Sequence, residues 1–407
     1  MRKPVYIEKS GRIVKRVADW RCIDAVNARV TISALTREAG SSRHLNPTSL
    51  DSLLMRAGSR DDPALWHRER GAWTPGGDSP GRDIRELAAA LIHFGIGAGR
   101  TALVLGGEGP DTTRAALAVL TAGACLVRLD AGASDALLLE ALHASRVALA
   151  LVEDDRQLQR VLALRPDLPE LELVILLAGE QSERKAAALL VASAVDIGAA
   201  LLDRDPRVLA RARADLPEVA PAVLVPSGAR LTPLSADAMA ALAHRLTDEV
   251  SVGPGRAVLV MLPPDGVESL AVVLGALSRG ATVLVVSDHE RIDLGLREKV
   301  PDGAFISAAT LSRLREEWLE DLAQRPLWFQ SLTRWALREG ADPARHPRRY
   351  RIADWLVLSR IRARWGGRLR GWGVLRADVP QEVSGFFASI GVPIYVMPGI
   401  ATAAVAR

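Results

Sequence analysis

The stretch "IRELAAALIHFGIGAGRTALVLGGEGPDTTRAALAVLTAGACLVRLD", residues 84–130, decides the fold class. Its first part has apolar residues at helical spacing, namely Ile84, Leu87, Leu91 and Phe94, which predicts an amphipathic helix. The run "TALVLGG" then predicts a buried strand, "DTTRAALAVLTAG" a second helix, and "ACLVRLD" the next strand. Uniformly apolar strands that alternate with helices are typical of parallel sheets covered by helices.

The same alternation continues along most of the chain. "VALALVEDD" repeats the strand, and after Ala222 the strands "AVLVP", "AVLVML" and "ATVLVV" are separated by helices, the first of them from Ser235. We therefore expect an α/β protein with two βαβ-type subdomains and mainly parallel sheets. The predicted division is an N-terminal arm and linker over 1–46, a first subdomain over 47–215 and a second over 216–407, with an Arg/Trp-rich helical insertion over about 310–367.

Composition limits the classes of function. The 407 residues are 49% hydrophobic and 25% charged, and the net charge of +4 is small beside 52 basic and 48 acidic residues. This is typical of a soluble globular protein and does not indicate nucleic-acid binding. Arginine makes up nearly all the basic residues, which is a codon-usage signature of a GC-rich bacterial genome.

Cellular location is predicted from cysteine content and hydropathy. Cys22 and Cys125 form no metal-ligand spacing, so neither a disulfide framework nor structural zinc is expected. The N-terminus has no apolar signal segment, and the longest apolar run, 186–202, is interrupted by Asp196, which makes it a poor membrane span. The sequence thus predicts a cytoplasmic protein with no metal site.

The glycine-rich loop "LGGEGPDTTRAAL" imitates a dinucleotide fingerprint because it follows a strand, precedes a helix and has Asp130 about twenty residues further on. However, Thr112 stands where the third glycine is needed, and Pro110 lacks an N–H group. An ordinary strand-to-helix turn is the favoured interpretation. The paired acids of "VEDD", residues 152–155, are interpreted as the start of a helix, where carboxylates are favourable.

The segment "RRYRIADWLVLSRIRARWGGRLRGW", residues 348–372, is basic with interleaved aromatics. Its apolar residues predict a helix with one apolar face surrounded by arginines: Ile352, Trp355, Leu356, Ile361 and Trp365. Such a helix could contact an anionic membrane or an acidic partner through Arg348–Arg370. A helix packed on the core with a solvated basic face is the favoured alternative.

The stretch "AVLVPSGARLTPLSADAM", residues 222–239, reads as a buried strand, a Ser-Gly turn and, almost at once, a helix start. A strand, a glycine turn and a helix N-terminus together form a site that can hold phosphate. This turn is unusually short and contains no lysine.

Taken together, these segments resemble the adenylate-forming (AMP-binding) superfamily, specifically the long-chain fatty-acyl-CoA synthetases. The similarity runs from about residue 46 to 399 and also includes "WFQSLTRWALREG", "ADWLVLSRIRARWGGRLRGWGV" and "VPQEVSGFFASIGVPIYVMPG". The resemblance implies a fold like the N-terminal part of these enzymes, which activate a carboxylate with Mg-ATP and transfer the acyl group to coenzyme A. The order and spacing of many segments carry it, not one motif.

The resemblance also implies that the nucleotide machinery is degenerate. The family's phosphate loop, Thr-Ser-Gly-Thr-Thr-Gly-x-Pro-Lys-Gly followed by Leu-Thr-His, is reduced to a remnant of Ser227, Gly228, Arg230 and Thr232, with Pro233 in place of histidine. In the motif that supplies the nucleotide and metal contacts, Gly399 is kept, but Ala401 and Thr402 replace threonine and glutamate. The nucleotide and acyl-pocket segment aligns with Val374, Leu375, Arg376 and Ala377, and a family histidine aligns with Gly266.

These changes predict a pseudoenzyme. We expect no catalytic residues, no ATP or Mg²⁺ binding and no C-terminal domain within the sequence, which ends at Arg407. The expected role is an interaction or regulatory scaffold in acyl metabolism, with a protein partner or a homodimer. Two alternatives stay open: a fatty-acid or acyl-binding protein that uses a residual acyl channel, and a half-enzyme for fatty-acyl adenylation and CoA ligation completed in trans.

Overall fold

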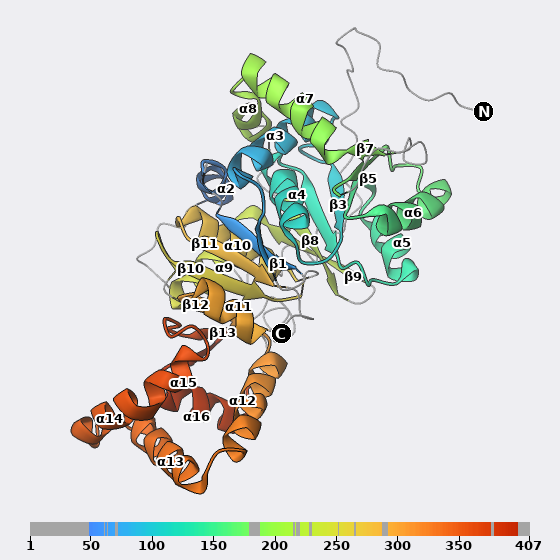
Figure 1. Cartoon of the computed structure of the whole chain (residues 1–407). Helices are drawn as coiled ribbons and strands as arrows, with labels where there is room; N and C mark the ends of the chain where they lie inside the picture. The colour runs from blue at the N-terminus through green and yellow to red at the C-terminus, as the bar shows by residue number, and fades with distance from the viewer. Residues whose placement is uncertain are drawn as a thin grey trace.

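The computed structural model describes residues 49–397 except 61, 63, 70–71, 179–187, 215, 217–219, 228–229, 251, 264–265, 287–291 and 376–377. The predicted N-terminal arm, residues 1–46, lies outside the described residues. Within the described part, the strands form two seven-stranded sheets, which Figure 1 shows one above the other.

The first sheet has the strand order β7-β6-β5-β3-β4-β8-β9. Its neighbours are parallel except for β8 and β9, which form an antiparallel hairpin at one edge. The strands are β3 (Thr101–Leu105), β4 (Cys125–Leu129), β5 (Val147–Val152), β6 (Leu173–Leu176), β7 (Leu189–Leu190), β8 (Pro221–Ser227) and β9 (Arg230–Ser235).

The second sheet has the order β14-β13-β12-β10-β11-β1-β2 and is parallel except for the hairpin of β1 and β2. The prediction of an α/β fold with two mainly parallel sheets is confirmed. The strands are β1 (Leu65–Glu69), β2 (Ala72–Pro75), β10 (Ala257–Met261), β11 (Thr282–Val286), β12 (Gly303–Ile306), β13 (Trp372–Leu375) and β14 (Ile394–Met397).

The two sheets exchange strands across the predicted boundary between residues 215 and 216. Strand β8 follows that boundary but pairs with β4 of the first sheet, whereas β1, from the N-terminal half, pairs with β11 of the second. Hydrophobic patterning shows that a segment is a strand, but its neighbours depend on packing between segments that are distant in sequence. The subdomains are therefore interleaved and not consecutive.

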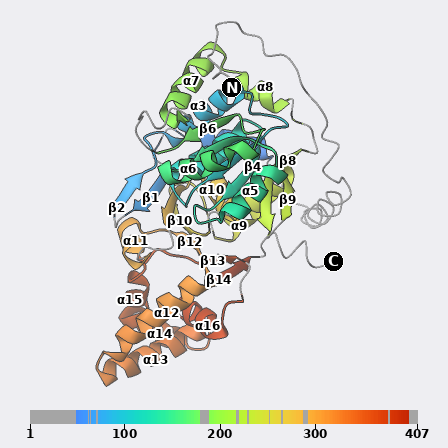
Figure 2. The same ribbon diagram turned by 90° about the vertical axis from the view of Figure 1, so that its right-hand side faces the viewer.

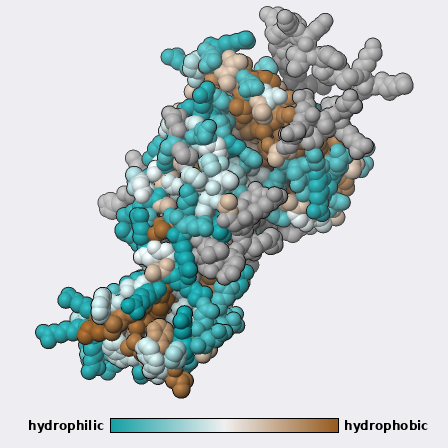
Figure 3. Space-filling view, viewed as in Figure 1, coloured by the Kyte–Doolittle hydropathy of each residue, from teal (hydrophilic) through white to brown (hydrophobic). Residues whose placement is uncertain are grey.

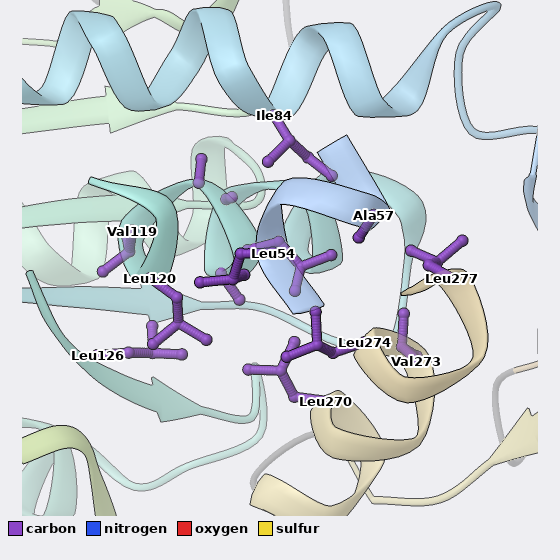
Figure 4. Close-up of a cluster of buried hydrophobic side chains, with 14 of the residues drawn as sticks. Leu54, Ala57, Ile84, Val119, Leu120, Leu126, Leu270, Val273, Leu274 and Leu277 are labelled. Atoms are coloured by element: carbon purple, nitrogen blue, oxygen red, sulfur yellow. The ribbon is translucent and has the colours of Figure 1, made fainter. Parts of the chain in front are cut away.

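Helices connect the sheets and cover their faces. One buried cluster contains side chains from both sheets and from helices α2, α3, α4, α9 and α10, and in Figure 4 Leu54, Leu120, Leu126 and Leu270 from four different elements converge in it. The helices around the sheets are α2 (Leu50–Gly58), α3 (Pro80–His93), α4 (Pro110–Thr121), α5 (Asp135–Ala144), α6 (Asp155–Leu164), the 3₁₀ turn η1 (Arg165–Asp167), α7 (Val191–Arg204), α8 (Val208–Ala214), α9 (Ala236–Glu249), α10 (Val267–Ser278) and α11 (Ile292–Lys299).

A separate group of helices, here called the helical lobe, projects from the second sheet in two orthogonal views (Figures 1 and 2). Its core is aromatic: the Phe387 ring centroid lies 5.5 Å from those of Trp365 and Trp372 and 5.1 Å from that of Phe386. The lobe consists of α12 (Ala308–Ala323), α13 (Leu327–Ala341), α14 (Pro347–Ala353), the π-helical turn η3 (Asp354–Leu358), α15 (Ser359–Ala363) and α16 (Gln381–Ser389).

The single apolar face predicted for residues 352–365 is wrong. Ile361 and Trp365 are buried, whereas Ile352 and Trp355 are 53% and 75% exposed. At 3.6 residues per turn, Ile361 and Trp365 lie about 180° and 220° around the helix axis from Ile352, so these residues do not share one face. A π-helical turn, η3, also interrupts the helix between them. None of the helices described is long and apolar enough to cross a membrane.

Candidate functional site

The predicted phosphate-loop remnant lies on the β8–β9 hairpin. In the antiparallel ladder Ser227 is directly opposite Arg230, Pro226 opposite Leu231, and Val225 opposite Thr232. Only two residues, 228 and 229, connect the strands, and they lie outside the described residues. The hairpin therefore brings three of the four predicted residues, Ser227, Arg230 and Thr232, onto two facing strands, with Gly228 at their connection.

The sequence predicted that this turn leads almost directly into a helix, and this prediction is wrong. Strand β9 intervenes, and helix α9 begins only after Ser235, whose Oγ accepts a hydrogen bond of 3.2 Å from the Ala238 N–H. At about 3.4 Å per residue, the turn and this helix N-terminus lie roughly 17 Å apart along the strand. The strand was missed because "RLTPLS" contains a proline, which an edge strand tolerates.

The other predicted site residues belong to the second sheet. Val374 is buried and Leu375 is half-buried, both at the end of β13. Gly266 caps the N-terminus of α10. The remaining predicted positions, Arg376, Ala377, Gly399, Ala401 and Thr402, lie outside the described residues.

The glycine-rich loop after β3 is occupied by the protein's own side chains. The Gly107 N–H donates a 2.8 Å hydrogen bond to Glu153 Oε2, and Thr112 Oγ1 donates one of 2.7 Å to the Gly107 carbonyl. A Cβ at Gly106 would lie 2.6 Å from Thr112 Cγ2 and 2.7 Å from Glu153 Cβ. The glycines thus make room for internal packing, which supports the interpretation of this loop as an ordinary turn.

Glu153 is a residue whose role the sequence did not reveal. Of the "VEDD" acids, Asp154 caps helix α6 as expected and accepts a 2.9 Å hydrogen bond from the Gln157 N–H. Glu153 points instead to the loop after β3. Burial raises the pKa of its carboxyl, and the hydrogen bond from Gly107 opposes that rise.

A second buried polar group joins the first sheet to helix α10. Glu108 accepts a 2.5 Å hydrogen bond from Ser269 Oγ of α10 and lies 3.4 Å from the Arg128 guanidinium of β4. Both charged side chains are about 95% buried. Because removing one member would leave the other charge buried and unpaired, we interpret this group as structural. It was missed because its members are separated by up to 161 positions.

Comparison with known proteins agrees with this fold. Residues 81–215 match the AMP-binding enzyme family, and no curated protein matches the chain. A long-chain-fatty-acid-CoA ligase from Archaeoglobus fulgidus has a TM-score of 0.63 at 13% identity, covering 89% of this chain and 66% of that one. An acetoacetyl-CoA synthetase from Streptomyces lividans has a TM-score of 0.59 at 17% identity, covering 86% of this chain and 50% of that one.

A third solved structure is the A domain of carboxylic acid reductase from Segniliparus rugosus, in complex with AMP and a co-purified carboxylic acid. Its TM-score is 0.55 at 15% identity, covering 92% of this chain and 63% of that one. The fold is thus that of adenylate-forming enzymes, and the predicted resemblance is confirmed by this shared fold and by the family match over residues 81–215. The chain spans about half to two-thirds of the length of these three proteins.

Proposed function

We propose that this protein is an acyl-CoA-synthetase-like pseudoenzyme that does not adenylate carboxylates and acts as an interaction or regulatory scaffold in acyl metabolism. One observation carries the proposal: Ser227 pairs directly with Arg230, so two residues make the whole connection where related enzymes have a phosphate loop. The family match and the shared fold support a common framework with those enzymes.

The shortened connection removes the donors that hold phosphates. A phosphate loop surrounds its ligand with several backbone N–H groups and a lysine ammonium. A two-residue turn has few N–H groups to offer, and the last lysine of the sequence is Lys299, outside this hairpin. Each hydrogen bond to a charged group contributes about 1.5–3 kcal/mol, so losing three weakens binding by roughly a thousandfold or more. The expected loss of ATP and Mg²⁺ binding is part of this proposal.

The helical lobe supports a binding role. It exposes four large apolar side chains, Leu327, Trp328, Ile352 and Trp355, each more than half accessible, and Figure 3 shows apolar patches on the lobe among hydrophilic side chains. Tryptophan and arginine are enriched where proteins bind each other.

Charge indicates the kind of partner. Between residues 325 and 370 the sequence has twelve arginines but only three acidic residues, Glu339, Asp342 and Asp354. Two copies meeting through this surface would bring like charges together, which is unfavourable. An acidic protein surface with an apolar centre fits better than a second copy of the chain.

The first test is equilibrium dialysis of the purified protein against labelled Mg-ATP and AMP, with the Segniliparus rugosus A domain as positive control. We expect no saturable binding up to millimolar nucleotide. Saturable binding in the micromolar range would contradict the proposal and would justify adenylation assays with a panel of fatty acids.

The second test concerns the scaffold role. We expect the double variant Trp328→Ser/Trp355→Ser to lose a partner that the wild type captures, and Met55→Ser, which removes an exposed apolar side chain from helix α2, to retain it. Deletion of residues 1–46 tests whether the arm is the interface instead. If neither the double variant nor the deletion reduces capture, the scaffold role assigned to these surfaces is wrong.

A further inference from the structure

The helical lobe contains a hollow of about 560 Å³ that is lined in part by the predicted basic helix, residues 348–370, but by none of the predicted nucleotide-site residues. This volume lies within the range of small-molecule sites, which are mostly apolar with a few polar groups. Its walls come from α11, α12, α13, η3 and α15, together with flanking residues, so segments from 297 to 364 meet around it.

The apolar part of the wall comes from α12, α13, η3 and α15. It consists of Trp318, Leu322, Phe329, Leu356, Val357 and Ile361. The ring centroid of Trp318 lies 4.9 Å from that of Phe386 in the aromatic core of the lobe. This packing holds the wall in place. The π-helical turn η3 supplies Leu356 and Val357, and such turns are frequent at functional sites.

The polar part of the wall is strongly positive. Four arginines line the hollow, Arg297, Arg325, Arg360 and Arg364, against one carboxylate, Asp321. Asp321 forms an ion pair with Arg364, and Arg297 Nε donates a 2.9 Å hydrogen bond to the Arg364 carbonyl. The side chains of Arg325 and Arg360 are exposed and have no ion-pair partner among the described residues. Their guanidinium groups are therefore available to an anion.

A buried hydroxyl in the same wall also lacks a partner. Thr333 is 1% exposed, and its Oγ1 forms no hydrogen bond within the described part of the chain. Buried polar groups are normally hydrogen-bonded, so an unpaired hydroxyl that lines a hollow points to a ligand or a bound water.

We propose that this hollow binds one amphiphile with a phosphate head and a single apolar chain. The phosphate would pair with Arg325 and Arg360, the chain would lie along the apolar wall, and Thr333 Oγ1 would bond to an oxygen near the head. The excess of three positive charges favours a phosphate monoester, which carries nearly two negative charges, over a carboxylate. This site goes beyond the proposed scaffold function and does not depend on the nucleotide hairpin.

The test is titration calorimetry of the whole chain with dodecyl phosphate below its micelle concentration. We expect saturable binding at one site. Dodecanoate, dodecanol and inorganic phosphate should each bind at least about tenfold more weakly, because dodecanoate carries only one negative charge, dodecanol carries none and inorganic phosphate has no chain. Absence of saturable dodecyl phosphate binding, or tighter binding of dodecanoate, would overturn the proposal.

Two matched arginine pairs locate the site. Arg325→Gln/Arg360→Gln should weaken binding by about tenfold or more, whereas Arg348→Gln/Arg349→Gln removes the same charge from exposed positions outside the hollow and should leave affinity unchanged. Equal weakening by both pairs would mean general electrostatic attraction and would overturn the site.

Two wall variants complete the test, each checked for folding by near-ultraviolet circular dichroism. Leu356→Trp should block the hollow, and Thr333→Val should weaken binding at unchanged shape. Full binding by a folded Leu356→Trp protein would overturn the proposal. If that variant does not fold, the arginine pairs decide.

Vesicles distinguish the source of the phosphate head. Phosphatidylcholine vesicles with and without lysophosphatidate, a phosphate monoester with a single chain, are compared for binding of the wild type and of Arg325→Gln/Arg360→Gln. Vesicle binding that this double substitution abolishes supports a lipid head group in the hollow, and binding of free dodecyl phosphate alone supports a soluble ligand. Binding of lysophosphatidate vesicles that survives the substitution means that the lobe surface recognises the lipid, which would overturn the hollow as the site.

Discussion

Replacing Gly340 by alanine should destabilise the helical lobe, whereas the same replacement at Gly385 should stabilise it. Gly340 lies in α13, where an added Cβ would be 1.9 Å from the Ser389 carbonyl oxygen and 3.0 Å from Leu358 Cδ1. Gly385 lies in α16, and nothing lies within 4 Å of a Cβ added there. Neither glycine has a positive φ, so backbone conformation does not separate the two sites.

The expected magnitudes follow from two opposing effects. Alanine in a helix interior is about 1 kcal/mol more favourable than glycine, and at Gly385 this is the whole effect. At Gly340 the carbonyl that the methyl meets belongs to the backbone, so α13 and α16 must move apart. Overpacking of this kind costs about 1–3 kcal/mol. At the upper end of that range the Gly340→Ala protein is about 2 kcal/mol less stable than wild type, and the two variants differ by about 3 kcal/mol.

The assay is urea unfolding followed by tryptophan fluorescence. Six of the nine tryptophans lie between residues 318 and 372, so the signal reports mainly on the lobe. We expect the midpoint to fall for Gly340→Ala and to rise for Gly385→Ala at unchanged slope. Midpoints that shift in the same direction for both variants would refute the close approach of α13 and α16.

Three further results are expected. Burial raises the pKa of Cys125 to about 12, so its thiol should resist iodoacetamide at about pH 9 in the folded protein and react in urea, as measured by peptide mass spectrometry. The contribution of this group to the free energy of unfolding is lost as pH rises from about 9 towards 12. Burial also raises the pKa of Glu153, so the free energy of unfolding should fall as pH rises from about 4.5 through the folded pKa, and Glu153→Gln should lack this fall. If the urea midpoints of wild type and Glu153→Gln change equally between about pH 5 and 7.5, this prediction is wrong. Phe387→Ala, at a fully buried ring, should cost about 3–5 kcal/mol and reduce the near-ultraviolet dichroism of its neighbour Trp365.

Elements with a strong local pattern could be predicted from the sequence. Strands 101–105 and 125–129 are apolar almost throughout, and both are entirely buried. Sheet membership could not be predicted, because the pairing of β8 with β4 is decided by packing across nearly a hundred residues. The different burial of Ile352 and Ile361 could have been predicted, because a period of 3.6 places them about 180° apart around the helix axis.

The candidate sites, like the sheets, could be predicted only in part from the sequence. The resemblance identified Ser227 and Arg230 as neighbours of a shortened loop, and the register of the hairpin supplied what the sequence lacked, namely that they face each other. The hollow in the helical lobe has no motif, because Arg297, Thr333 and Arg360 come from separate elements and meet only in the fold. The sequence alone does not identify Thr333 as part of a site. Its burial does, together with the absence of a hydrogen-bond partner for its Oγ1 among the described residues.

The proposed loss of the phosphate loop is compatible with an intact fold because of where this hairpin lies. The connection joins the last two strands at the edge of the first sheet, and the pairing of β8 with β4 does not involve it. Inserting the family's seven residues, Thr-Thr-Gly-Ser-Pro-Lys-Gly, after Gly228 would lengthen the connection from two residues to nine. The loop-closure entropy of the longer connection should lower the free energy of unfolding by about 1.3 kcal/mol.

The same insertion after Gly107 is the matched control. There it would break the hydrogen bond from the Gly107 N–H to Glu153 and the bond from Thr112 to the Gly107 carbonyl, so the unfolding free energy should fall by several kcal/mol in total, from two bonds and their packing. Urea midpoints compare the two insertions. A large loss at the hairpin would mean that the short connection between β8 and β9 supports the sheet. A small loss there would show that the turn is free to change length, so that a phosphate site can disappear from this framework while the fold persists.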